Sequence, residues 1–184
     1  MVADADILFA AYRDGVFRYL CRIVGYGEAG ELTQEVFLRV SRGPVPSVDD
    51  SGHRAWIFSI ARNLALNHVR DGKRRSVAVQ LSETAGPFDR LRAEPPTQET
   101  AAVLRDALDR LPDLDRDVFL MREASGLSYD EIATACALST AAVRSRLHRA
   151  RVQLRQALGP ALRSGQTLGG VRLYDRTGTG QRSS

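Results

Sequence analysis

Basic and small polar side chains gather on a stretch of the chain that begins at Ser139, and no acidic residue lies between Ser139 and Arg172. Arginine donates several hydrogen bonds to phosphate or to base edges, and hydroxyl and imidazole groups can add to them. The side chains with this chemistry are Thr140, Arg144, Ser145, Arg146, His148, Arg149 and Arg151. The stretch is therefore suited to binding a polyanion.

Apolar residues recur along the same stretch at helical spacing, which predicts an amphipathic helix with one buried stripe: Val143, Leu147, Ala150, Leu154 and Leu158. The ordinary interpretation of its basic side is a solvated surface. The absence of acids and the small residues Ala141, Ala142 and Ser145, which permit close approach to a groove, favour nucleic acid instead.

A shorter helix precedes this one, and together they predict a helix-turn-helix over Gly126 to Leu154. Ser128 and Glu131 have the spacing of a capping box, so the first helix is expected to begin at Ser128. Its apolar side is Ile132, Ala133, Cys136 and Leu138. Ser139 or Thr140 can cap the second helix after a very short connection.

A second basic segment extends from His53 to Arg75, with five Arg and Lys73 against the single acid Asp71. A helix closing at Asp71-Gly72 would carry an apolar seam of Trp56, Ile60, Ala61, Leu64 and Val69. Its polar groups, with the basic residues that follow, include Arg62, Asn63, Asn67, Arg70, Lys73 and Arg74. Cations, amides and aromatics in this mixture suit single-stranded nucleic acid, although Trp56 and Phe58 fit equally well as core aromatics.

Four more segments have helical spacing: Asp6 to Val24 with a possible break near Gly15, a helix from Glu31 after a glycine-punctuated loop, Glu99 to Leu111, and a helix from Asp113 after the stop at Pro112. The helix from Glu31 leaves one set of residues outward: Glu31, Gln34, Glu35, Leu38 and Arg39. Val103 is expected inward, and Asp113 is expected to cap its helix. The acids are expected on exposed faces, away from phosphate: Asp106, Asp109, Asp113, Asp115 and Asp117.

The whole chain has 184 residues, of which 43% are hydrophobic. We expect an all-α fold of two small helical domains joined by a flexible linker, and a tail beyond Gly159-Pro160 that is disordered. No apolar run approaches the roughly 20 residues of a membrane span, and acids near the N-terminus argue against a signal peptide, which predicts a cytoplasmic protein. Cys21 and Cys136 are expected to be buried free thiols.

Catalytic chemistry is not predicted. The three histidines, His53, His68 and His148, are dispersed, and neither a carboxylate cluster for a metal nor a nucleophile with its base is apparent. We therefore expect no enzyme, no metal and no cofactor.

Three motifs in order resemble the extracytoplasmic-function (ECF) class of bacterial sigma factors, which keep only sigma domains 2 and 4: LTQEVFLRV, AWIFSIARNLALNHVR and LPDLDRDVFLMREASGLSYDEIATACALSTAAVRSRLHRAR. The resemblance implies domain 2 at 1–75, a linker at 76–98, domain 4 at 99–159 and a tail at 160–184.

The resemblance also implies a function: binding core RNA polymerase, directing it to promoters and helping to melt the minus-ten region. It implies polymerase contacts by Glu31, Gln34, Glu35, Leu38 and Arg39, and contacts to the melted minus-ten strand by Arg62, Asn63, Asn67, Arg70, Lys73 and Arg74. Duplex contacts to the minus-thirty-five element would come from Thr140, Arg144, Ser145, Arg146, His148 and Arg149. An anti-sigma factor is a further expected partner.

Two departures from the family pattern predict an unusual minus-ten preference. The loop from Gly43 to Gly52 lacks the aromatic or basic residue that relatives often place around a flipped base, and Asn67 stands where many relatives carry Asp. The alternative function is a helix-turn-helix regulator that binds operator DNA without a polymerase role, which leaves the first 75 residues without a purpose.

Overall fold

The computed structural model describes residues 5–43, 49–75 and 98–163, and only the backbone of 73–75, 98–101 and 160–163. Their secondary structure is entirely helical: α1 Ala5–Val24, α2 Tyr26–Arg42, α3 Asp50–Arg75, α4 Gln98–Asp109, α5 Asp113–Glu123, α6 Tyr129–Cys136 and α7 Thr140–Arg163. The prediction of an all-α fold with a helix-turn-helix is confirmed. The expected linker, apart from Gln98, and the tail beyond Arg163 lie outside the described residues.

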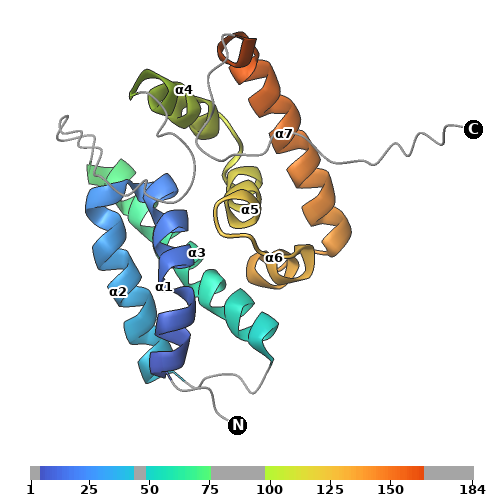
Figure 1. Cartoon of the computed structure of the whole chain (residues 1–184). Helices are drawn as coiled ribbons and strands as arrows, with labels where there is room; N and C mark the ends of the chain where they lie inside the picture. The colour runs from blue at the N-terminus through green and yellow to red at the C-terminus, as the bar shows by residue number, and fades with distance from the viewer. Residues whose placement is uncertain (1–4, 44–48, 76–97, 164–184) are drawn as a thin grey trace, which may run out of the picture.

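The first three helices lie side by side and form the N-terminal half (Figure 1). α1 is one helix that runs through Gly15, where a Cβ would stand 3.5 Å from the Phe58 ring, so the glycine admits a close neighbour rather than breaking the helix. The expected loop before Glu31 is wrong. Only Gly25, with φ of 88°, separates α1 from α2, and Gly27 and Gly30 are helical.

α3 begins earlier and ends later than its predicted limits of His53 and Asp71-Gly72. Its start is explained by Asp49, whose Oδ1 accepts hydrogen bonds from the Gly52 backbone N–H at 2.9 Å and from the Ser51 hydroxyl at 2.8 Å. These bonds lower the pKa of the Asp49 carboxyl. The predicted apolar seam is shifted: Phe58, Ala61 and Leu64 are buried, whereas Trp56 and Ile60 are only partly buried against the core.

The last four helices form the C-terminal half, in which α5 packs against α6 and α7. The predicted capping box is present: the Ser128 backbone N–H donates to Glu131 Oε2 at 2.6 Å, and the Glu131 N–H donates to Ser128 Oγ at 3.2 Å. Ala137 makes the corner in the left-handed region with φ of 54°, and Ser139 Oγ then accepts from the Ala142 N–H. The predicted stripe of α7 is buried throughout: Val143, Leu147, Ala150, Leu154 and Leu158.

Three expectations for the C-terminal half are wrong. Val103 is 38% exposed instead of inward. Pro112 occupies the N-cap of α5, and Asp113 does not cap it but pairs with Arg116 at 3.2 Å. α7 continues through Gly159 and Pro160 to Arg163, so the expected disorder does not begin at Gly159-Pro160.

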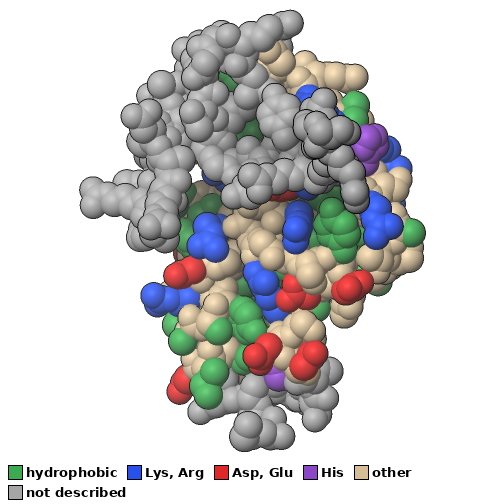
Figure 2. All heavy atoms as spheres, turned by 45° about the vertical axis from the view of Figure 1, so that its right-hand side comes forward, with side chains coloured by type: hydrophobic (Ala, Val, Ile, Leu, Met, Phe, Trp, Pro, Cys, Tyr) green, Lys and Arg blue, Asp and Glu red, His purple; other side chains and the backbone are tan. Residues whose placement is uncertain are grey.

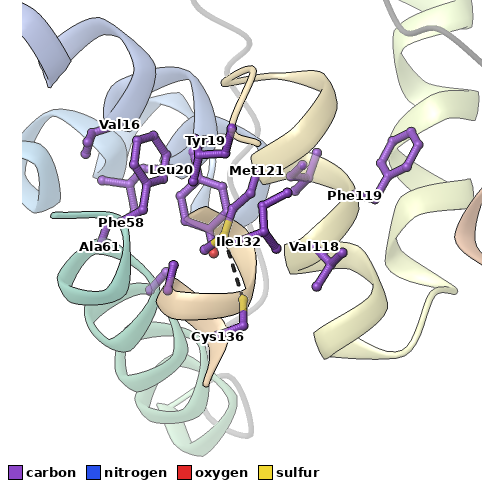
Figure 3. Close-up of a cluster of buried hydrophobic side chains, with 14 of the residues drawn as sticks. Val16, Tyr19, Leu20, Phe58, Ala61, Val118, Phe119, Met121, Ile132 and Cys136 are labelled. Carbon is purple, nitrogen blue, oxygen red and sulfur yellow. Dashed lines mark hydrogen bonds between the residues drawn. The ribbon is translucent and has the colours of Figure 1, made fainter. Parts of the chain in front are cut away.

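Residues of both halves contribute to one cluster of buried hydrophobic side chains. Figure 3 shows Tyr19, Leu20, Phe58 and Ala61 of the N-terminal half meeting Met121, Ile132 and Cys136 of the C-terminal half. The closest packing between the halves is that of α3 against α6. None of the described helices is long and apolar enough to cross a membrane.

Replacing Ser128 by Ala should lower the free energy of unfolding by about 1 kcal/mol, because α6 loses the acceptor for its third backbone N–H. Denaturant unfolding measures the change. Ser41→Ala is the matched control, since its hydroxyl only donates to the Leu38 carbonyl on an exposed helical surface. Equal losses in the two variants would contradict a stabilising role for the cap.

Candidate nucleic-acid interface

Some of the α7 residues that were predicted to contact DNA are exposed to solvent. The exposed members are Arg144, Ser145, His148 and Arg149. Three of them line a shallow hollow between α6 and α7 with residues from both helices: Tyr129, Ala141, Arg144, Ser145, His148 and Arg151. Thr140 is half-buried, and its hydroxyl donates to Asp130 at 2.9 Å, so it joins α6 to α7.

Two arginines of this surface converge on one buried carboxylate of α5. Arg146 Nη1 lies 2.6 Å from Asp115 Oδ1, and Arg149 Nε lies 3.2 Å from Asp115 Oδ2. Asp115 is 2% exposed, so its expected place on an exposed face is wrong. Burial alone would raise the pKa of Asp115, but the hydrogen bonds and charges of Arg149 and Arg146 together outweigh it and hold the pKa below its ordinary value.

The predicted minus-ten residues divide between two sides of α3. Asn63, Asn67 and Arg70 are exposed at helical spacing on one stripe, where Arg70 Nη2 donates to Asn67 Oδ1 at 2.8 Å. The backbone of Lys73 and Arg74 continues α3, but their side chains lie outside the described residues. Amides and a guanidinium on one stripe can bind bases and phosphates of an unstacked strand.

Arg62 lies apart from that stripe, in the junction between the halves. Its Nε donates to Asp117 Oδ2 at 2.8 Å, and the Tyr19 hydroxyl donates to Asp117 Oδ1 at 3.2 Å. Asp117 is 1% exposed, which makes its predicted exposure wrong as well. Burial raises the pKa of Asp117 above its ordinary value despite these two partners, and burial also raises the pKa of Tyr19.

Arg54 makes the second polar junction between the halves. It donates through Nη2 to the Ser125 carbonyl and through Nη1 to the Gly126 carbonyl at 3.4 Å, and it lies 3.7 Å from Glu131. In return, the Ser125 hydroxyl donates to the Gly15 carbonyl at 3.0 Å. Sequence reasoning missed this role, because basic residues inside a basic segment carry no sign of which of them meets a distant backbone.

α2 presents the predicted docking set along one face. Glu31, Gln34 and Leu38 are exposed at helical spacing, and Leu38 is 42% exposed. Arg39 Nε donates to Glu35 Oε1 at 2.8 Å on the same surface. An exposed leucine among paired charges is a reasonable contact for another protein.

Figure 2 turns the side of the molecule that carries α7 toward the viewer and shows separate Lys and Arg side chains with acidic side chains beside them. In the described part of the chain, no group of three or more His, Cys, Asp or Glu could hold a metal ion. Both cysteines are free thiols, and burial raises the pKa of each to about 11. The loop residues 44–48 of the predicted base pocket lie outside the described residues.

Residues 8–75 match Sigma-70 region 2, and residues 101–154 match Sigma-70 region 4. The RNA polymerase sigma-H factor of Pseudomonas aeruginosa is 32% identical, with 86% of this chain and 88% of that protein covered. The ECF RNA polymerase sigma factor SigC of Mycobacterium tuberculosis is 30% identical, over 79% of this chain and 78% of that protein.

The chain belongs to the ECF family of RNA polymerase sigma factors. The ECF sigma factor SigE of Mycolicibacterium smegmatis is 35% identical over 83% of this chain, and the chain spans 61% of the length of that relative. The predicted resemblance is confirmed.

Solved structures support the same fold for this ECF sigma factor. The sigma factor RpoE of Bartonella quintana, in complex with the anti-sigma factor NepR, matches with a TM-score of 0.63 and 21% identity over 82% of this chain and 94% of that one. CnrH, in complex with the cytosolic domain of CnrY, matches with a TM-score of 0.61 and 21% identity over 85% of this chain and 88% of that one.

Replacing Arg54 by Ala should loosen the junction between the halves of this ECF sigma factor. Hydrogen bonds to a charged group contribute about 1.5 to 3 kcal/mol, so the separated population should rise about tenfold or more. Cys136 is the reporter because it is buried close to Arg62 and Tyr19 at the junction. Its rate of alkylation, read at its own peptide by mass spectrometry, should rise with that population.

Arg13→Ala is the control, since that guanidinium pairs with Asp14 on its own helix. Hydrogen exchange of the α5 and α7 backbone should stay slow in both variants. An unchanged alkylation rate at Cys136 in Arg54→Ala would contradict a stabilising role for this junction.

Proposed function

We propose that this chain binds core RNA polymerase, directs it to specific promoters and helps to open the minus-ten region. The observation that carries the proposal is the presence of three separate exposed surfaces on one chain that matches sigma regions 2 and 4: the α2 face around Leu38, the α3 stripe around Asn67 and the α7 surface around Arg149. In this proposal RNA synthesis belongs to the polymerase, and the chain acts as its non-catalytic subunit. A partner of polymerase and promoter acts in the cytoplasm.

The α7 surface is suited to duplex DNA. A recognition helix enters the major groove, where arginine can donate two hydrogen bonds to guanine O6 and N7. Arg144 and Arg149 are the exposed arginines among the predicted DNA contacts of α7, and Ser145 and His148 lie beside them. Arg146 and Thr140 are engaged within the protein, so their share of the work is to hold the helix in place.

The α3 stripe is suited to the strand after it separates. Asn63 and Asn67 can donate to and accept from the Watson–Crick edges of unstacked bases, while Arg70 neutralises phosphate. Capture of such bases offsets a few kcal/mol of unpairing, so recognition and melting occur together.

Arg62 couples promoter binding to the arrangement of the halves. Its guanidinium is held by the buried Asp117, so contact between Arg62 and a DNA strand requires that α3 release α5. The closed arrangement described here is then a state in which Arg62 is withheld from DNA. An anti-sigma factor is the expected restraining partner, because the two structural neighbours are each described in a complex, one of them with an anti-sigma factor.

The proposal is tested by run-off transcription with purified core polymerase and fragments of the host genome. Discrete start sites should appear only when the chain is added, while the free chain should bind the same duplexes weakly. Tight binding of the free chain as a dimer, with no initiation on any fragment, would support the operator-binding regulator instead.

Docking on polymerase is tested separately at Leu38. Leu38→Asp should weaken binding to core polymerase about tenfold, since burial of a leucine contributes about 1.5 kcal/mol or more. Competition against a labelled sigma factor measures the affinity. Ile7→Asp is the matched control, because Ile7 is 65% exposed on α1. An equal loss in both variants would place the docking surface elsewhere.

A further inference from the structure

Asp115 lies on α5 behind the exposed surface of α7, and it contacts Arg149 as well as Arg146. Its carboxylate is 2% exposed, although its partner Arg149 is half exposed to solvent. Close packing of the surrounding core restricts this buried carboxylate to one position. Asp115 can therefore hold the Arg149 guanidinium in one orientation.

The geometry of the pair leaves a specific set of donors free. Arg149 places Nε 3.2 Å from Asp115 Oδ2 and Nη2 3.4 Å from Asp115 Oδ1, which engages one edge of the guanidinium. Nη1 donates to Ser145 Oγ at 3.4 Å. A guanidinium has five N–H donors, so one hydrogen on each terminal nitrogen remains. That pair is the one that guanine O6 and N7 accept together.

Arg146 supplies the positive charge that stabilises the ionised form of the buried Asp115 carboxylate. Its Nη1 lies 2.6 Å from Asp115 Oδ1, and its side chain is largely buried between α5 and α7. With Arg146 as a second partner, the Asp115 carboxylate stays paired and can hold Arg149 in place while the free edge of that guanidinium contacts DNA. Arg146 holds the Asp115 carboxylate in place, and Asp115 in turn orients Arg149.

We propose that Asp115 is a positioning residue for promoter specificity, which holds the Arg149 guanidinium with its terminal edge outward for a guanine in the minus-thirty-five element. The proposal rests on the proposed function for its DNA target. Asp115 acts through Arg149 and touches no DNA itself. Because the Arg149 guanidinium is already oriented before DNA binds, base recognition costs less side-chain entropy.

The test compares base preference at each minus-thirty-five position, measured by run-off transcription from templates that carry all four bases there. Arg149→Ala should relax the preference at one position about fivefold or more, the lower end of what a bidentate arginine–guanine contact contributes. Asp115→Asn should relax the preference at that same position. The double variant should relax it no further than Arg149→Ala alone.

The matched control is Asp113→Asn, which removes the same charge two residues away, where the carboxylate pairs with Arg116 and not with α7. It should keep the wild-type preference. Because preference is a ratio within one preparation, a smaller folded fraction lowers all templates equally and leaves the ratio unchanged.

Selection of duplexes from a random pool by the free chain at low salt measures the same preference without polymerase. If the wild-type chain fails to initiate but still selects duplexes with an Asp115-dependent base preference, the sigma function fails and the positioning role stands. The positioning role is overturned if Asp115→Asn keeps the wild-type preference, if it raises use of every template equally, or if the wild-type chain neither initiates nor selects any base as the free chain.

Discussion

Two buried carboxylates on α5 hold the molecule in the arrangement described here. Asp115 and Asp117 are two residues apart, so their side chains leave the helix on nearly opposite sides. Asp115 faces Arg146 and Arg149 of α7, and Asp117 faces Arg62 of α3 and Tyr19 of α1. A buried charge left unpaired is strongly destabilising, so each carboxylate fixes the side of the molecule that supplies its arginine. α5 therefore positions both nucleic-acid surfaces, although it belongs to neither.

This constraint divides the arginines that sequence alone treats as one basic population. Arg144 and Arg70 are exposed, and their charge is available to phosphate. Arg62 is committed to a carboxylate of the other half, whereas Arg149 is shared between a carboxylate and solvent. The net charge of +4 says nothing of this division, because the same residue type serves as an electrostatic contact, a structural tie or a directed donor according to its neighbours.

Local signals in the sequence predicted local structure well. The Ser128–Glu131 capping box, the stop at Pro112 and the buried stripe of α7 need only neighbours within a few turns, and the structure confirms each of them. The start of α3 was missed because the capping role of Asp49 shows only in its hydrogen bonds. The junction of Arg62 with Asp117 spans 55 positions, and no local pattern announces it.

The sequence indicated which candidate residues face outward, but not which arginines form contacts within the protein and which remain available to nucleic acid. Spacing predicted that the residues of the α2 face and of the exposed α3 stripe point outward, and the described side chains do so, whereas their roles came from the resemblance to the family. Asp115 and Asp117 of α5 were expected to be exposed because unpaired acids avoid the core. They are buried because three arginines from other helices reach them, and pairing over such distances depends on the tertiary fold.

The surroundings of Asp115 and Asp117 shift the pKa values of the two carboxyl groups in opposite directions. The pKa of Asp115 is lowered, so its ionised form stabilises the fold above the ordinary carboxyl value, and that contribution is lost only as pH falls through the lowered pKa. The pKa of Asp117 is raised, so ionisation opposes the closed arrangement, which gains stability as pH falls through the raised pKa. Burial of the charge is therefore compensated by the arginines at Asp115 but not fully compensated at Asp117. The contact that withholds Arg62 from DNA is thus distinct from the contacts that join α5 to α7 through Asp115, so release of Arg62 does not require loss of the α7 surface.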